Sequence, residues 1–284
     1  MVKSYIPKTL IAAVKIRKET GAVPIAGGTD LMVRYRNIAG TLPTFPWPVM
    51  YISNLEELKG ICKEQNTVII RAGTELSAVC ESSLVHPVLR DAVRQMAAPA
   101  LRNLGTLAGN ICNASPAGDA VCVLYALNAE VELATEKSMR RMLLSEFITG
   151  PGKTELKSDE LMTAIRIPVL NDNVSFYKKV GTRKANALSK LSCAGLLCKE
   201  NGIITDMRLA VGAVAPVVVQ SAELEKSIQG MNFREFSKYE DHLFQAYAEL
   251  IVPIDDQRST AEYRKTVACG LIKEFFKIIK EELA

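Results

Sequence analysis

The sequence predicts an α+β protein, and three observations carry this prediction. Short runs rich in β-branched residues alternate with helical patterns in the first half of the chain. Longer strand patterns follow one another in the second half, two of them joined by Asn201-Gly202, which is a favoured hairpin turn. Helical patterns then close the chain. The 284 residues are 48% hydrophobic and 23% charged, which is ordinary for a globular protein and excludes a disordered or collagen-like chain.

The first hundred residues predict a helix followed by strands and a second helix. Leu10, Ala13 and Val14 follow helical spacing, and Gly21 occupies the position at which helices usually stop. The expected elements are a helix over 9–20, strands over 22–26, 49–52 and 68–72, and a helix over 84–98.

The middle of the chain predicts a long ordered loop and then a buried helix. Residues 105–119 lack periodicity and are rich in Gly, Asn, Ser and Pro, whereas 120–127 are almost entirely apolar. Strands are expected over 131–134 and 161–167. Because a single core rarely grows beyond roughly 250 residues, we expect two domains, with residues 1–173 forming the first and 174–284 the second.

The second domain is expected to contain an antiparallel sheet. Residues 174–180, 189–198 and 204–214 have strand patterns, and the Asn201-Gly202 turn joins the last two. The final helix is expected to begin with a capping box at Ser259-Thr260-Ala261-Glu262.

Charge and cysteine usage narrow the class of protein. Lys and Arg total 35 against 31 Asp and Glu, and they are interspersed, so nucleic acid is not an expected partner. The seven cysteines include no C-x-x-C pair and are expected to be buried, reduced thiols, and two histidines are too few for a His-rich metal site. No apolar stretch approaches 18 residues and no cleavable leader is recognisable, which predicts a cytoplasmic protein that does not enter a membrane.

The first candidate site is the glycine pair Gly27-Gly28, which follows the expected strand over 22–26 and precedes Thr29-Asp30. Residues without a Cβ atom let backbone N–H groups converge on an anion, and Thr29 can add a hydroxyl donor. A tight turn after a strand explains the same pattern. The motif by itself therefore leaves a phosphate site and a turn open.

The second candidate site is the segment Thr106–Asp119. It combines two glycines, the hydroxyls of Thr106 and Ser115, the amides of Asn110 and Asn113, and a terminal acid. Such a loop suits a diphosphate and a polyol chain. The alternative is a surface loop held by Asx and Ser turns. Two phosphate-type loops in one domain favour a dinucleotide.

Other sequence motifs do not indicate a nucleotide-binding or catalytic site. The Gly-Lys-Thr at 152–154 lacks the glycine that a P-loop requires five positions earlier, because Phe147 stands there. Neither G-x-G-x-x-G nor G-x-S-x-G occurs. We therefore expect no catalytic side chains and no metal ligands in this chain.

At the two loops, Ala26–Leu31 and Thr106–Asp119, the sequence resembles the FAD-binding medium subunits of the molybdenum hydroxylases, which include xanthine dehydrogenase and carbon monoxide dehydrogenase. In that family an Ala-Gly-Gly-Thr-Asp-Leu loop and a Thr-Ile-Gly-Gly-Asn-Ile-x-x-Ala-Ser-Pro-x-x-Asp loop bind FAD. Further similar segments in the same order are 149–153, 159–168, 177–180 and 256–264. One departure is Ala108, which stands where the family usually has glycine and which must either keep a negative φ or shift slightly.

The resemblance implies a vanillyl-alcohol-oxidase-type (PCMH-type) FAD-binding domain of two α+β subdomains, followed by a smaller C-terminal α+β domain. It also implies two loops around the FAD diphosphate, Asp119 on a cofactor hydroxyl, Leu161 or Met162 beside the flavin, and Lys178 near the polar edge of the flavin. The implied cofactor-binding residues are Val23, Pro24, Ile25, Ala26, Gly27, Gly28, Thr29, Asp30, Leu31, Thr106, Leu107, Gly109, Asn110, Asp119, Leu161, Met162 and Lys178.

The resemblance further implies an oxidoreductase subunit, most similar to the xanthine dehydrogenase type. Electrons would pass from [2Fe–2S] clusters of a partner subunit through FAD to NAD⁺, and another partner would hold the molybdenum cofactor. Two alternatives remain open: a stand-alone flavin-dependent oxidase, and a structural subunit without FAD.

Overall fold

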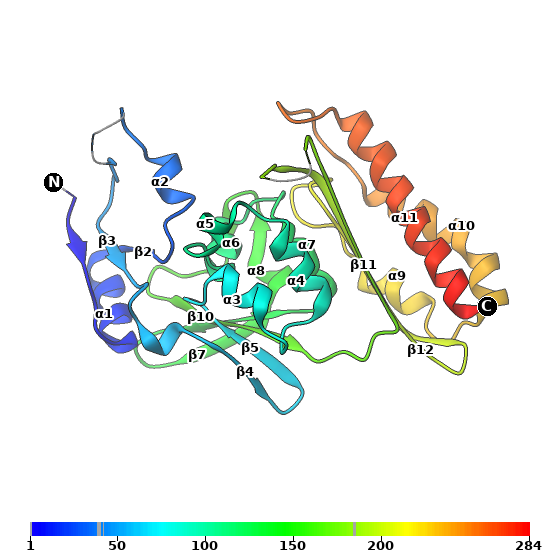
Figure 1. Cartoon of the computed structure of the whole chain (residues 1–284), viewed down its shortest axis with the longest axis horizontal. Helices are drawn as coiled ribbons and strands as arrows, with labels where there is room; N and C mark the ends of the chain where they lie inside the picture. Colours follow the sequence, from blue (N-terminus) through cyan, green and yellow to red (C-terminus); the bar gives the residue numbers. More distant parts are fainter. Residues whose placement is uncertain (1, 39–40, 42, 184–185) are drawn as a thin grey trace. The chain divides into compact units, whose positions relative to one another are not determined.

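A computed structural model describes residues 2–38, 41, 43–183 and 186–284 (Figure 1). The chain forms two compact units, each assembled from separate stretches of sequence. The first unit comprises residues 1–85, 97–114 and 129–168, and the second comprises residues 86–96, 115–128 and 169–284. Within the described ranges, no helix combines the length and the apolar character needed to cross a bilayer. The division at 173/174 that the sequence predicts stays a prediction.

The first unit begins with a small parallel sheet and a helix. Strand β3 (Val49–Tyr51) pairs in parallel with β1 (Ser4–Tyr5) and with β2 (Val23–Ile25). Because β2 is an edge strand, it tolerates a proline at its centre. Helix α1 (Leu10–Thr20) lies between β1 and β2 in sequence and ends at Gly21, whose φ of 65° is left-handed, as the sequence predicts.

The rest of the first unit is built on a five-stranded antiparallel sheet in the order β4-β5-β10-β6-β7. The central strand β10 is buried along most of its length, which explains its nearly continuous apolar sequence. The strands are β4 (Ile61–Glu64), β5 (Thr67–Arg71), β6 (Glu130–Ala134), β7 (Met139–Leu143) and β10 (Leu161–Pro168).

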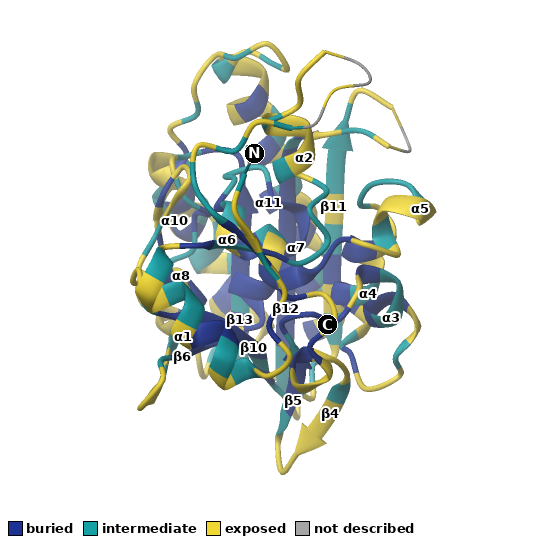
Figure 2. Ribbon diagram, turned by 90° about the vertical axis from the view of Figure 1, so that its left-hand side faces the viewer, coloured by how far each residue is buried: buried dark blue, intermediate teal, exposed yellow. Residues whose placement is uncertain are grey.

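Short helices and one small hairpin complete the first unit. They are α2 (Leu31–Arg34), the 3₁₀ turn η1 (Glu56–Leu58), α3 (Leu76–Glu81), α5 (Pro99–Arg102), α6 (Leu107–Asn113), α8 (Leu144–Phe147), β8 (Ile148–Gly150) and β9 (Lys153–Thr154). Helix α2 has no buried residue and is drawn mainly in yellow and teal in Figure 2.

The second unit contains the predicted antiparallel sheet, in the order β11-β12-β13. Asn201 and Gly202 both have positive φ, 51° and 75°, as a type I′ hairpin turn requires. The elements of this unit are α4 (Pro87–Arg94), α7 (Asp119–Ala126), β11 (Val174–Gly181), β12 (Ser189–Glu200), β13 (Ile203–Gly212), α9 (Ala222–Ser227), α10 (Phe233–Leu250) and α11 (Ala261–Leu283).

Helices cover both faces of this sheet. On one face, a Cβ atom added to Gly195 of β12 would contact the ring of Phe275 of α11. On the other face, Cys122 Sγ of α7 donates to the carbonyl of Ala210 on β13, at 3.3 Å. Every residue of α7 is buried, as the apolar run over 120–127 predicts.

Several local predictions are wrong. Thr106 caps a helix, α6, inside the segment predicted as a loop. The helix predicted over 84–98 is shorter than expected, because only Pro87–Arg94 (α4) is helical. A proline begins this helix, and the backbone has a positive φ at Ala97 beyond its end. The cap of α11 is Thr260, which accepts from the Tyr263 N–H, so Ser259 is not the cap and the predicted capping box does not form, because the third helical residue is Tyr263 and not a glutamate. The cysteines also differ from the prediction in part, since Cys62 and Cys112 are exposed.

Glu225 of α9 carries a prediction about stability and pH. The carboxylate is buried, and Oε1 accepts from the Leu209 N–H at 2.9 Å and from Gln220 Nε2 at 3.1 Å. Burial nonetheless raises its pKa to about 7. Between the ordinary value of 4.5 and about 7, the folded chain binds more protons than the unfolded chain, so stability falls as the pH rises through this window.

We therefore expect Glu225→Gln to increase the free energy of unfolding at pH 8, by on the order of 2 kcal/mol, and to change it little at pH 4. Urea unfolding at both pH values measures the difference. Glu223→Gln, on an exposed position of the same helix, is the control and should be neutral at both. An equal effect of Glu225→Gln at both pH values would contradict this account.

Candidate functional site

The first glycine loop joins β2 to α2 in the first unit. Gly28 has a φ of 67°, which favours glycine, and its carbonyl accepts from the Met32 N–H at 2.8 Å. At position 27 glycine is required for a different reason, namely the lack of space for a side chain. A Cβ atom at this position would lie 1.9 Å from the carbonyl oxygen of Leu104 and 2.9 Å from the backbone nitrogen of Gly105. The backbone of the first loop is therefore packed directly on the backbone that leads into the second loop.

The second loop enters α6 through Thr106. Its hydroxyl accepts from the Gly109 N–H at 3.0 Å and caps the helix, while the Leu76 N–H donates to the Gly105 carbonyl at 2.8 Å. Ala108 is the second residue of α6 and is not among the residues with positive φ. Its substitution for the glycine usual in the family is thus compatible with helical backbone.

Asn110 of α6 has an unsatisfied polar atom. Its Oδ1 is buried and has no hydrogen-bond partner. Buried amide atoms are rarely left unpaired, and the two ends of an asparagine amide are assigned from their partners. The side chain can thus offer either an acceptor or N–H donors to a bound molecule. The close contact at Gly27 holds the two loops together, and the unpaired amide of Asn110 offers a partner to a polar ligand. These two features fit loops that hold a ligand such as a diphosphate.

The other residues implied by the family fall in different places. Leu161 and Met162 are the first two residues of β10, and both are buried in the first unit. Asp119 and Lys178 belong to the second unit. The structure thus brings the two loops together in the first unit, and it places Asp119 and Lys178 in the second unit.

Asp119 begins α7 and is part of a buried polar cluster. Its Oδ2 lies 2.7 Å from Lys179 Nζ, and its Oδ1 accepts from the Ser189 hydroxyl. Lys179 Nζ also donates to the carbonyl of Gln95 at 2.8 Å. Burial raises the pKa of Tyr177 well above its ordinary value, and the negative charge of Asp119 raises it further, so the phenol stays protonated.

Lys178 and Lys179 lie on opposite faces of β11. Lys178 Nζ lies 3.4 Å from Glu274 of α11 and is half exposed, whereas the side chain of Lys179 is only 7% exposed beside Asp119. Sequence reasoning missed Lys179. The alternation of side chains along a strand could have separated the two lysines, but it could not have identified which face carries Asp119.

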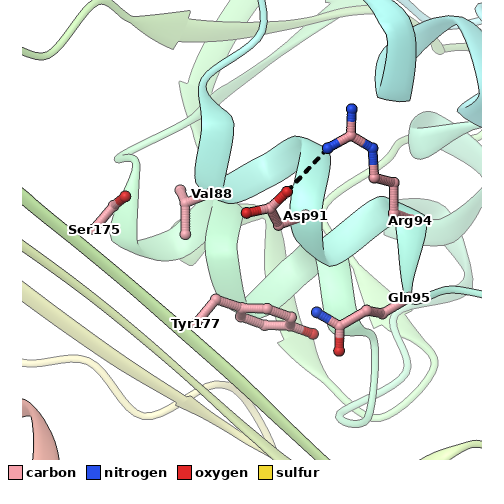
Figure 3. Close-up of a pocket in the computed structure, with 6 residues that line it drawn as sticks. All are labelled: Val88, Asp91, Arg94, Gln95, Ser175 and Tyr177. Atoms are coloured by element: carbon pink, nitrogen blue, oxygen red, sulfur yellow. Dashed lines mark hydrogen bonds and ion pairs between the residues drawn. The ribbon is translucent and has the colours of Figure 1, made fainter. Parts of the chain in front are cut away.

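A depression of about 400 Å³ lies within the second unit, between α4 and β11 (Figure 3). Asp91 and Arg94 form an ion pair of 3.1 Å beside it, and the Tyr177 ring forms part of its wall. Its lining residues are Val88, Asp91, Arg94, Gln95, Ser175 and Tyr177. None of them belongs to the predicted cofactor-binding set.

Comparison with known proteins identifies the class of this chain. A family model described as the FAD-binding domain in molybdopterin dehydrogenase matches residues 1–170. A second, described as the carbon monoxide dehydrogenase flavoprotein C-terminal domain, matches residues 175–279. The chain therefore belongs to the family of FAD-binding subunits of molybdenum hydroxylases, and the family resemblance found in the sequence is confirmed.

Individual relatives match along nearly the whole chain. The xanthine dehydrogenase FAD-binding subunit of Escherichia coli O157:H7 is 29% identical, covering 92% of this chain and 88% of its own length. The glyceraldehyde dehydrogenase medium chain of Sulfolobus acidocaldarius is 31% identical, with 89% of each chain covered.

Solved structures bear out the predicted fold. In carbon monoxide dehydrogenase from Hydrogenophaga pseudoflava, in the form lacking the molybdenum–pyranopterin moiety, a chain superimposes with a TM-score of 0.84 at 26% identity. The match covers 96% of this chain and 95% of that one. The predicted fold, a two-part α+β FAD-binding domain with a smaller C-terminal domain, is confirmed, and the chain is an oxidoreductase subunit.

Proposed function

We propose that this chain is the flavin subunit of a xanthine dehydrogenase-type enzyme, in which electrons pass from [2Fe–2S] clusters of a partner subunit through FAD to NAD⁺. The observation that carries the proposal is the backbone contact of Gly27 with Leu104 and Gly105, which joins two phosphate-type loops in a chain of an FAD-binding family. When bound, FAD supplies both single-electron and hydride chemistry. The residues of this chain bind and orient it.

The residues fall into three roles under this proposal. Residues Val23–Leu31 and Thr106, Leu107, Gly109 and Asn110 surround the diphosphate and neighbouring groups, with backbone N–H groups of the glycine pair and the side-chain amide of Asn110 as the donors. The buried side chains of Leu161 and Met162 form an apolar surface that excludes water beside the flavin. Asp119 and Lys178 remain proposed contacts to a cofactor hydroxyl and to the polar edge of the flavin.

The proposed partners are an iron–sulfur subunit and a molybdenum-cofactor subunit in the cytoplasm. The chain has two histidines and no C-x-x-C pair, so its sequence favours clusters held elsewhere. The name of the Escherichia coli relative supports the xanthine dehydrogenase type. The name of the Sulfolobus relative, which is a glyceraldehyde dehydrogenase chain, supports an aldehyde-oxidising complex as the second candidate.

Reconstitution tests the cofactor assignment. We expect the purified chain, stripped of ligand and incubated with FAD, to retain about one flavin per chain after gel filtration, measured by its visible absorption spectrum. FMN serves as the control, because it lacks the diphosphate and adenosine that the two loops are proposed to hold. Absence of flavin bands after FAD treatment would favour the structural subunit.

Two further measurements test the finer assignment. Anaerobic addition of NADH to the flavin-loaded chain should bleach its absorption, whereas an unchanged spectrum would exclude NAD⁺ as the acceptor. Co-purification with an iron–sulfur chain from the native source distinguishes an electron-transfer subunit from a stand-alone oxidase. Turnover of a heterocycle or an aldehyde by that complex separates the two candidate types.

A further inference from the structure

Arg34 and Asn113 join two segments that are far apart in the sequence. Arg34 Nη2 donates to Asn113 Oδ1 at 3.1 Å, across a sequence separation of 79 residues. Arg34 is the last residue of α2, which directly follows the first glycine loop. Asn113 is the last residue of α6, the helix that Thr106 caps inside the second segment, Thr106–Asp119. Both residues lie in the first unit.

Apart from Tyr35 at its C-terminal end, whose ring packs against Trp47 with 4.7 Å between ring centroids, helix α2 has few contacts to hold it in place. It comprises four residues, none of them buried, and the side chain of Asp30 makes no capping hydrogen bond. Helices this short are not stable by themselves, and tertiary contacts must fix their position. Met32 and Val33 are exposed by 46% and 63%, so apolar packing of these side chains does not anchor the helix.

The two loops are thus connected at two places. At the start of the first loop, the backbone of Gly27 rests on Leu104 and Gly105. At the far end, the Arg34 side chain reaches Asn113. A pair of loops fixed at both ends keeps its backbone N–H groups at a constant separation. Such preorganisation raises affinity because less order must be imposed when a ligand binds.

We propose that Arg34 and Asn113 are positioning residues that hold the two loops at the separation required by the FAD diphosphate. The inference rests on the proposed binding of FAD by these loops. Arg34 acts through Asn113 and makes no contact with the cofactor. Neither residue belongs to the set that the family resemblance implies.

Titration of the ligand-free chain with FAD tests the proposal. Trp47 is the single tryptophan and lies in the first unit, so quenching of its fluorescence by bound flavin reports binding without any activity assay. We expect Arg34→Ala and Asn113→Ala each to weaken FAD binding about three- to tenfold, as loss of one hydrogen bond implies. The double variant should lose no more than either single variant, because the two residues act as a pair.

Two controls make the result specific. Arg36→Ala removes the same charge from an exposed position two residues further on and should leave the affinity unchanged. Repeating the titration at higher salt distinguishes positioning from a direct ion pair with phosphate. A large, salt-dependent loss in Arg34→Ala with none in Asn113→Ala would overturn the proposal. Additive losses, or no loss in either variant, would overturn it as well.

Hydrogen exchange separates this proposal from the proposed function. In the flavin-free chain, the amides of residues 26–31 and 106–110 should exchange faster in both single variants than in the wild type. If wild-type chain binds no FAD but this difference is present, the assignment of the cofactor fails and the link between the loops stands. Unchanged exchange together with normal FAD binding in both variants would refute the link alone.

Discussion

Gly27→Ala should abolish tight FAD binding, with an expected loss of affinity of roughly a hundredfold or more. Gly27 does not have a positive φ, so alanine can adopt the backbone conformation, and the effect is purely steric. The new methyl carbon would lie 1.9 Å from the Leu104 carbonyl oxygen and 2.4 Å from its carbon. Ordinary contact between these atoms requires more than 3 Å, so the two loops must move apart.

Titration with FAD and urea unfolding of the flavin-free chain together measure this effect. Separation of the loops should lower the free energy of unfolding by about 1–3 kcal/mol, within the range for an overpacked position. Gly21→Ala is the matched control. It also lies in the first unit and has a φ of 65°, but a Cβ atom there meets nothing within 4 Å. It should lose about 1 kcal/mol of stability and retain FAD. Normal FAD affinity in Gly27→Ala would disprove the role of the loop contact.

Gly195→Ala should be the most destabilising single methyl addition in the second unit, by about 3 kcal/mol. Its Cβ would lie 2.6 Å from the Phe275 ring, which is fully buried between β12 and α11. The ring itself packs 5.6 Å from that of Phe176, measured between centroids, so it has little room to retreat. Thermal and urea unfolding measure the loss of stability.

Two companion variants make this prediction specific. Gly270→Ala, in the helix that carries Phe275 but with nothing within 4 Å of the added methyl, should instead stabilise the chain by about 0.5–1 kcal/mol through helix propensity. Gly195→Ala combined with Phe275→Leu should lose less stability than the sum of the two single changes, because the smaller side chain makes room. Strict additivity would show that the methyl and the ring do not collide.

Local sequence signals predicted those features that neighbouring residues decide. Gly21 ends α1, and Asn201-Gly202 forms its turn, because in each case positive φ is needed within a few residues of the signal. The glycine pair and the Thr106–Asp119 segment are also local signals, and the phosphate-type site that they suggest stays a prediction. The prediction of a loop over this segment was wrong where α6 forms. A helix of seven residues is too short for its 3.6-residue periodicity to be recognised in the sequence.

The family resemblance supplied what periodicity could not, namely the topology and the cofactor. It left individual side chains undecided. Lys178 and Lys179 are adjacent and chemically identical, and only the pairing of β11 with its neighbours determines that Lys179 meets Asp119 while Lys178 meets Glu274.

The sequence by itself determined the α+β class, most of the strands, and two glycine-containing loops that suit a dinucleotide. Only the tertiary structure decided that Gly27 rests on Leu104, that Arg34 reaches Asn113, and that α4 and α7 join the second unit. The physical reason is the separation along the sequence of the residues that interact. Turns, caps and periodicity depend on interactions within a few residues, whereas these contacts join segments many residues apart and arise from the packing of the whole chain.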